Sequence, residues 1–137
     1  MDRVYIEKKN VLLIPGQDDP IFLTTMKARL AYYVLESNSP DIEIVLRARK
    51  MMYPGYPIWV EQKLTIRDIY ELGLVNNMCP NPRLPCVSVW DETNNKYIVI
   101  YSPAEAEEFP HGFELRLHNP TTDRMQYSIR MLAYTGE

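Results

Sequence analysis

Two histidines, His111 and His118, are the side chains best suited to acid–base or metal chemistry. They stand seven positions apart in the segment PHGFELRLH. Within one strand an odd separation places two side chains on opposite faces, so these rings are not expected to share a metal ion. The metalloenzymes built on β-sandwiches need a closely spaced histidine pair, a carboxylate and a third histidine, and this set is missing. We therefore expect no metal site and no cofactor.

Three carboxylates gather in the segment EAEEF (105–109). One interpretation is a general acid–base pair or a cation site, and the other is the solvated face of a short helix. Nothing in the sequence indicates that these carboxylates are buried, so we expect a solvated face. The nucleophile motif Gly-x-Ser-x-Gly is absent, and the five glycines form no phosphate-binding loop. The sequence thus predicts a protein that is not an enzyme.

Two cysteines, Cys79 and Cys86, bracket the segment CPNPRLPC. A disulfide between them would close an eight-residue loop. The chain-entropy model gives such a loop a stabilisation of about 2.5 kcal/mol. The alternative is a pair of reduced thiols in a proline-stiffened loop. We favour reduced thiols, because the N-terminal segment has no long apolar stretch of the kind found in secretory signals.

The charge pattern bears on partners and location. The formal net charge is −3, and both signs are interspersed without a basic block. This pattern disfavours nucleic acid as a partner. No apolar run approaches the roughly 18 residues that cross a bilayer. We therefore expect cytoplasmic synthesis, no membrane span and protein partners.

An aromatic stretch, MMYPGYPIW (51–59), is the first candidate contact region. Pro54-Gly55 has the residue order of a type II turn, which would join a strand ending near residue 52 to the strand 58–63. The rings of this stretch either fold back over the end of the domain or form an exposed contact surface. Stacking on a carbohydrate is one version of the second alternative. The interface candidates in this stretch are Tyr53, Pro54, Tyr56 and Trp59.

A second candidate contact region is the irregular segment NNMCPNPRLPC (76–86). Its prolines stiffen the loop, and a stiff loop loses little conformational entropy when it binds. The interface candidates here are Pro80, Pro82 and Leu84.

Most of the chain reads as strands joined by turns. Segment 21–37 fits both a helical and an alternating pattern, and we favour strand because turn residues follow it. A hairpin is expected around ETNN (92–95), and a second hairpin is expected to join 113–118 to 124–134, with the apolar alternate residues of both strands facing in. The expected strands are 3–7 and 10–15 as an opening pair, 41–50, 58–63, 86–91, 96–102, 113–118 and 124–134.

Two short helices are expected in the connections. In the segment 64–74, Thr65 is a candidate N-cap, Asp68 has the charge that a first turn favours, and Gly73 can end the helix in a left-handed conformation. The second helix is expected over 102–108, where the capping residues are Ser102, Pro103 and Glu105.

Seven or eight short strands with frequent turns predict a mainly β fold. We expect one domain over residues 1–137, an antiparallel β-sandwich or jelly roll with two short helices in its connections.

The segment FPHGFELRLHNPTTDRMQYSIRMLAY (109–134), with its Asn119-Pro120-Thr121 turn, resembles the closing strands of small β-sandwich and jelly-roll virion proteins of double-stranded DNA viruses and phages. It covers less than a fifth of the chain. The resemblance implies a capsid-associated or decoration role, symmetric assembly and no catalysis, and it assigns no functional residue.

The sequence therefore predicts a non-enzymatic structural protein that assembles with itself or with a larger shell, and the resemblance implies a virus particle as the setting. The alternative from a different class is a soluble ligand-binding module with carbohydrate stacked on the aromatic residues of 53–59.

Overall fold

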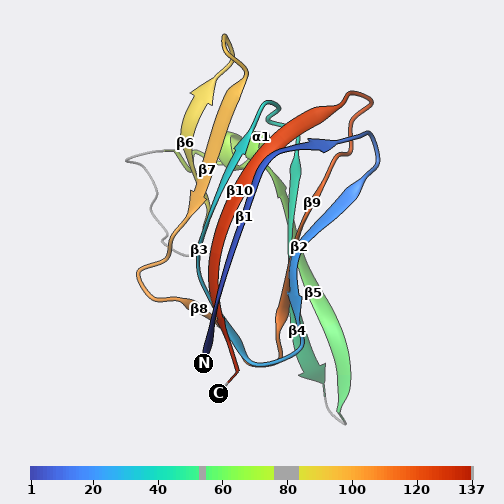
Figure 1. The fold of residues 1–137 in the computed structure, drawn as a ribbon, viewed down its shortest axis with the longest axis vertical. Coiled ribbons are helices and arrows are strands. Elements are labelled where there is room, and N and C mark those ends of the chain that lie inside the picture. Colours follow the sequence, from blue (N-terminus) through green and yellow to red (C-terminus); the bar gives the residue numbers. More distant parts are fainter. Residues whose placement is uncertain (53–54, 76–83, 137) are drawn as a thin grey trace.

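The protein folds into two antiparallel sheets that face each other, as the computed structural model in Figure 1 shows. The structure describes residues 1–52, 55–75 and 84–136. The larger sheet has the order β1 (Asp2–Leu13), β10 (Met125–Thr135), β3 (Ala28–Ser37), β7 (Lys96–Tyr101) and β6 (Cys86–Asp91), and β8 (Glu107–Phe109) also pairs with β3. The smaller sheet has the order β2 (Asp18–Thr24), β9 (Phe113–His118), β4 (Glu43–Met52) and β5 (Tyr56–Thr65). The expected mainly β, sandwich-like architecture is confirmed.

The core lies between the two sheets and is built from alternate residues of their strands. In β9 the buried apolar residues are Phe113, Leu115 and Leu117, and in β10 every second residue from Met125 to Ala133 is buried. Because side chains alternate between the faces of a strand, each strand gives one apolar row to the core. The inward residues predicted for these two strands are thus confirmed.

The predicted pairing of 113–118 with 124–134 is wrong. β9 pairs with β2 and β4, whereas β10 pairs with β1 and β3. The connection between them crosses from one sheet to the other, so their apolar rows meet across the core. The carboxamide of buried Asn119 holds this crossing by donating hydrogen bonds to the backbone oxygens of Leu13 and Asp123.

The opening of the chain also differs from expectation. In place of two short strands, 3–7 and 10–15, one strand runs from Asp2 to Leu13. Its register against β10 shifts between Lys8 and Val11, and Asn10 has a φ of +52° there. A β-bulge accommodates the extra residue, and asparagine tolerates this left-handed backbone better than most residues.

Segment 21–37 forms strands β2 and β3, which confirms strand over helix. The hairpin around 92–95 is present as β6 and β7, and Asn95 takes a φ of +49° in its turn. Strands β4 and β5 pair along their full lengths, which confirms the predicted connection of these two strands, while Pro54 of the predicted type II turn lies outside the described residues. Local turn chemistry therefore predicted these elements correctly.

Helix α1 (Ile66–Glu71) is the expected first helix. The Thr65 side chain accepts a hydrogen bond from the Asp68 backbone, and the Asp68 carboxylate accepts one from the Thr65 backbone. Gly73 follows with a φ of +79°. The helix lies against β5 and β6, and its Tyr70 ring stacks on Trp90 of β6 with centroids 4.1 Å apart. It therefore links an edge strand of one sheet to an edge strand of the other.

The second expected helix, 102–108, is wrong. Residues Glu107–Phe109 instead form β8, which pairs with residues Ala28–Leu30 of β3. This pairing extends the ladder of β3 beyond β7 and buries Phe109 in the core. The tertiary contact of this aromatic ring outweighs the capping signal at Ser102.

The oxidation state of Cys86 also differs from the expectation. Cys86 is disulfide-bonded, so the preference for reduced thiols is wrong for this residue. The sequence contains one other cysteine, Cys79, which lies outside the described residues.

Candidate interaction surfaces

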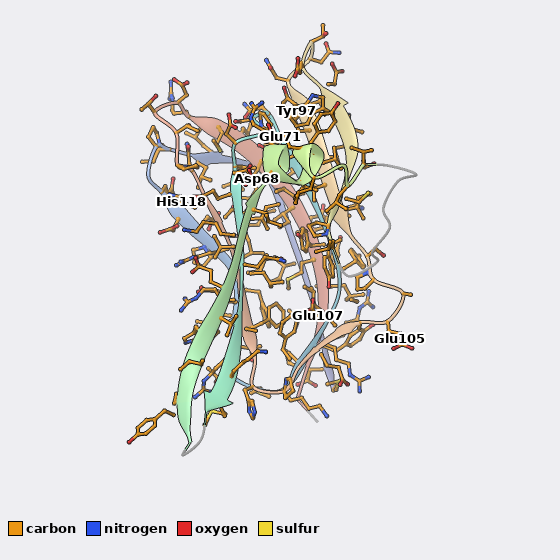
Figure 2. The ribbon with its side chains drawn as sticks, turned by 180° about the vertical axis from the view of Figure 1, so that it is seen from behind. Asp68, Glu71, Tyr97, Glu105, Glu107 and His118 are labelled. Atoms are coloured by element: carbon orange, nitrogen blue, oxygen red, sulfur yellow. The ribbon has the colours of Figure 1, made fainter. Side chains whose placement is uncertain are left out.

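The two histidines lie apart in the structure. His111 is exposed in the connection before β9, as expected, and His118 is the last residue of β9. Figure 2 shows His118 on the side of the smaller sheet that faces away from the core. Its Nδ1 lies 2.8 Å from Oδ1 of Asp18, and its Nε2 lies 3.7 Å from Oε1 of Glu43. The three side chains form a polar row across neighbouring strands β2, β9 and β4.

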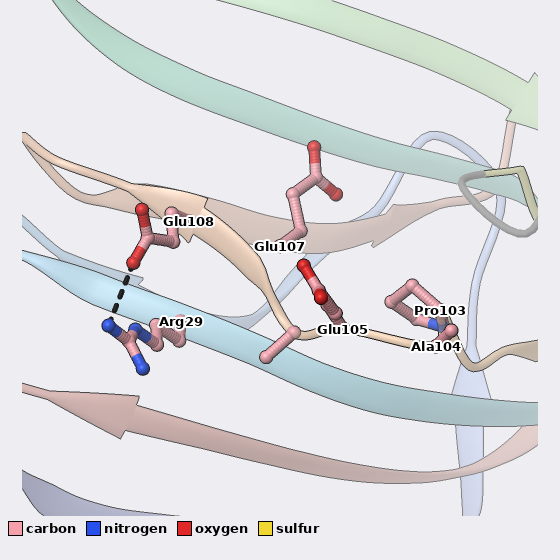
Figure 3. A pocket seen from close by; sticks show the side chains of 7 residues that line it. Arg29, Pro103, Ala104, Glu105, Glu107 and Glu108 are labelled. Carbon is pink, nitrogen blue, oxygen red and sulfur yellow. Dashed lines mark ion pairs between the residues drawn. The ribbon is translucent and has the colours of Figure 1, made fainter.

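The carboxylates of the segment 105–109 point in different directions. Figure 2 shows Glu107 turned toward the space between the sheets and Glu105 turned away. Glu107 accepts a hydrogen bond from the hydroxyl of Tyr101, while Glu108 is 2.8 Å from Nη2 of Arg29. Together with neighbouring residues they line an open hollow of about 1010 Å³ (Figure 3).

This hollow does not have the composition of a cation site. Two of its three carboxylates already have partners: Glu107 is bonded to the hydroxyl of Tyr101, and Glu108 is paired with the guanidinium of Arg29. Over residues 1–52, 55–75 and 84–136, the structure contains no group of three or more His, Cys, Asp and Glu side chains that could hold a metal ion.

The β4–β5 hairpin carries the aromatic candidates that the structure describes. Tyr56 is 70% exposed, so its ring does not plug the end of the core. Trp59 lies on the opposite face of β5 and is half-buried, with the guanidinium carbon of Arg47 4.7 Å from its ring centroid. One face of the indole is thus occupied by a cation. Tyr53 and Pro54 lie outside the described residues.

The second candidate region is described only at its end. Leu84 is half-buried and packs against the core, so it fixes the chain just before β6. Pro80 and Pro82 lie outside the described residues.

The outer face of the larger sheet lies apart from the two candidate contact regions at 51–59 and 76–86. In β10, β3 and β7, the residues between the core positions point away from the core, and many of them are apolar. One row across β1, β10 and β3 consists of Tyr5, Leu132 and Tyr32. In the next row, Val34 of β3 pairs with Ile100 of β7. The apolar residues of this outer face are Tyr5, Tyr32, Val34, Val89, Ile98, Ile100, Leu132 and Tyr134.

The outer face also contains a hollow. A hollow of about 440 Å³ lies across β1, β10, β3 and β7 beside the bulge in β1. Val34 and Ile98 contribute apolar surface to it, and charged walls come from Glu7, Glu36 and Arg130. Sheets that are covered on both faces have continuous apolar strands, and the runs LAYYVL (30–35) and YIVIY (97–101) have this character. Those runs were the signal in the sequence for this face.

No protein-family model matches the chain, and no curated protein is similar to it at a significant level. In the described parts of the chain, no helix is both long enough and apolar enough to cross a membrane.

Proposed function

We propose that this chain is a non-enzymatic structural protein that assembles with itself or with a larger protein shell. The observation that carries the proposal is the apolar outer face of the larger sheet. An antiparallel sheet that meets water on one side normally alternates apolar and polar residues. Here β3 and β7 present Tyr32, Val34, Ile98 and Ile100 to the outside. Apolar side chains gathered on the outer face of a sheet favour a protein contact there.

The order of the strands supports the jelly-roll version of the fold. The first strands alternate between the sheets, with β1 and β3 in the larger sheet and β2 and β4 in the smaller one. The first and last strands of the chain pair with each other, as do β2 and the penultimate strand β9. Jelly rolls occur in viral capsid proteins and also in lectins. A virion role is therefore our preferred setting, and it rests on analogy of fold and on the resemblance of segment 109–134.

The absence of catalysis is part of the same proposal. The side chains with the most chemistry, His118 and Glu107, lie on opposite sides of the smaller sheet, as Figure 2 shows. Glu107 accepts a hydrogen bond from Tyr101, and His118 lies 2.8 Å from Asp18 and 3.7 Å from Glu43. Neither faces a second reactive group across an enclosed pocket, so the arrangement offers no nucleophile held by a base.

A carbohydrate-binding module has less support. Sugar stacking needs a free aromatic face, and Arg47 lies over the ring of Trp59. Tyr56 alone among the described aromatic candidates is widely exposed. Binding to a glycan array that is lost on Tyr56→Ala would favour this module over the structural protein.

The proposal is tested by placing a charge on the outer face. Leu132→Lys and Val34→Lys put an ammonium group among apolar neighbours without entering the core. We expect both variants to keep the fold and to lose the association that the outer face provides, measured by light scattering as a lower native mass at high concentration. Thr122→Lys is the matched control, because residue 122 is exposed in the β9–β10 connection. A native mass at high concentration that neither outer-face variant lowers would contradict the proposal.

A further inference from the structure

The free edge of β5 is a second surface that the outer face does not explain. Among the described residues, β5 pairs with β4 on one side and ends the smaller sheet on the other. It is ten residues long, and its core-facing row includes the exposed residues Ile58 (40%) and Val60 (47%). Long apolar edge strands readily pair with another chain unless they are protected. In Figure 1 the β4–β5 hairpin extends past the strands of the larger sheet.

We propose that β5 pairs antiparallel with β5 of a second copy of this chain, about a twofold axis that passes through Gln62. Such an axis lies perpendicular to the sheet, so residues on the same face oppose each other. The two smaller sheets then form one continuous sheet of eight strands, because each contributes four. This inference rests on the proposed function, since it names one of the contacts through which the protein assembles.

Charge complementarity fixes the register. With the axis at Gln62, Glu61 lies opposite Lys63 of the second copy, and Lys63 lies opposite its Glu61. This arrangement continues an alternation that already crosses the smaller sheet. Glu61 pairs in register with Arg47 of β4, which pairs in register with Glu114 of β9. Arg47 Nη1 is 2.9 Å from Glu114 Oε1, and its Nε is 4.0 Å from Glu61 Oε2. Opposite charges directly across two strands stabilise their pairing.

The core-facing row fits the same register. The side chains of Gln62 from the two copies meet at the axis, where each amide can donate to the oxygen of the other. Val60 lies opposite Leu64 of the second copy on either side of them. The exposed Ile58 falls beside the start of α1 of the second copy, because that helix begins at Ile66. Val60 and Ile58 thus gain apolar cover.

Neighbouring registers are less favourable. An axis at Glu61 places two carboxylates opposite each other, and an axis at Lys63 places two ammonium groups opposite each other. An axis at Val60 brings Pro57 opposite Lys63, and proline has no N–H to donate to the new ladder. Only the axis at Gln62 leaves Pro57 outside the paired segment and joins unlike charges.

The experiment exchanges these charges and measures native mass by light scattering. Glu61→Lys gives a chain with two lysines at 61 and 63, and Lys63→Glu gives a chain with two glutamates there. Each variant alone opposes like charges, so we expect its dimer dissociation constant to rise about tenfold or more, ~1.4 kcal/mol. An equimolar mixture of the two restores unlike pairs, and we expect the dimer to return. Lys27→Glu, at an exposed position before β3, is the matched control.

Each outcome of this experiment supports or overturns the proposed pairing of β5 about Gln62. Loss of dimer in both single variants with recovery in the mixture supports the register at Gln62. A native mass that neither single variant lowers, or a mixture that does not recover, overturns it. Glu61→Lys also places a cation near Arg47, Arg116 and Lys63 of its own chain. If this variant does not fold, Glu61→Gln is used in its place with Lys63→Glu. If Leu132→Lys leaves assembly intact while the charge exchange abolishes it, the outer-face proposal fails and this one stands. If the charge exchange leaves assembly intact while Leu132→Lys abolishes it, the β5 contact fails and the outer-face proposal stands.

Discussion

The carboxamide nitrogen of Asn119 lies 2.9 Å from the backbone oxygen of Leu13, to which it donates a hydrogen bond across 106 positions of sequence. Asn119 is fully buried, and its nitrogen also reaches the backbone oxygen of Asp123 at 2.7 Å. Its oxygen accepts hydrogen bonds from the backbone and the hydroxyl of Thr121. One side chain therefore joins the end of β1 to the crossing between the two sheets.

Asn119→Ala should destabilise the fold strongly. The substitution removes the two hydrogen bonds that this buried side chain donates and the two that it accepts, and we expect a loss of about 3 kcal/mol in the free energy of unfolding. Urea denaturation measures this loss. The control is Asn94→Ala, an exposed turn asparagine whose side chain bonds Asp91, and we expect about 0.5 kcal/mol for it. Equal losses in the two variants would show that Asn119 does not hold the crossing.

Gly112 and Gly16 form a second matched pair. Both have a positive φ, +92° and +77°. A Cβ at Gly112 would overlap the backbone oxygen of Thr24, whereas a Cβ at Gly16 would meet no atom within 4 Å. Gly16→Ala should cost only the backbone strain, about 1–2 kcal/mol. Gly112→Ala should cost clearly more, because the backbone of Thr24 must also shift. Thermal unfolding of both variants would reveal the order, and a smaller cost at Gly112 would contradict the packing described here.

Alkaline pH should destabilise the protein through Tyr33. Burial, with a smaller contribution from the nearby charge of Glu107, raises the pKa of this phenol above its ordinary value. The folded state then holds the proton more tightly than the unfolded state does. The resulting stability is complete below the unfolded pKa of about 10 and is lost as pH rises beyond it. Tyr33→Phe should flatten this loss above pH ~10, whereas Tyr56→Phe, at an exposed site, should not. Equal slopes in the two variants would contradict the assignment.

The disulfide at Cys86 should stabilise the fold against reduction. If its partner is the other cysteine of the sequence, Cys79, the closed loop has eight residues. Reduction should then lower the free energy of unfolding by about 2.5 kcal/mol. The measurement is denaturation with and without a reductant, with Cys86→Ser as the variant that should show no response. Two free thiols titrated in the untreated protein would refute the bond.

Elements with local signals were predictable from the sequence. The Thr65–Asp68 capping box identified α1, and the asparagine turn identified the β6–β7 hairpin. The pairing of β9 and β10 was not predictable in this way. A short turn such as 119–124 fits either a hairpin or a crossing between sheets, and the choice depends on partners such as Leu13 that are far away in the sequence.

One property of the interface candidates, the exposure of Tyr56, was predictable from the sequence. The exposure of Tyr56 follows from its place beside a turn in an edge hairpin. The outward residues of β3 and β7 were not identified, because strands apolar on both faces, such as 97–101, show no alternation from which an outward row can be read. In the segment that forms β3, the spacing of the apolar residues also fits a helix. Only the pairing of β3 with β7 and β10 shows which residues share the outer face.

The most direct test of the central claim is the native mass of the unmodified protein over a range of concentrations, measured by light scattering behind a sizing column. The account predicts a dimer at low concentration and larger species as concentration rises, since the β5 edge and the outer face provide two separate contacts. A clean monomer at every concentration would contradict self-assembly through either surface.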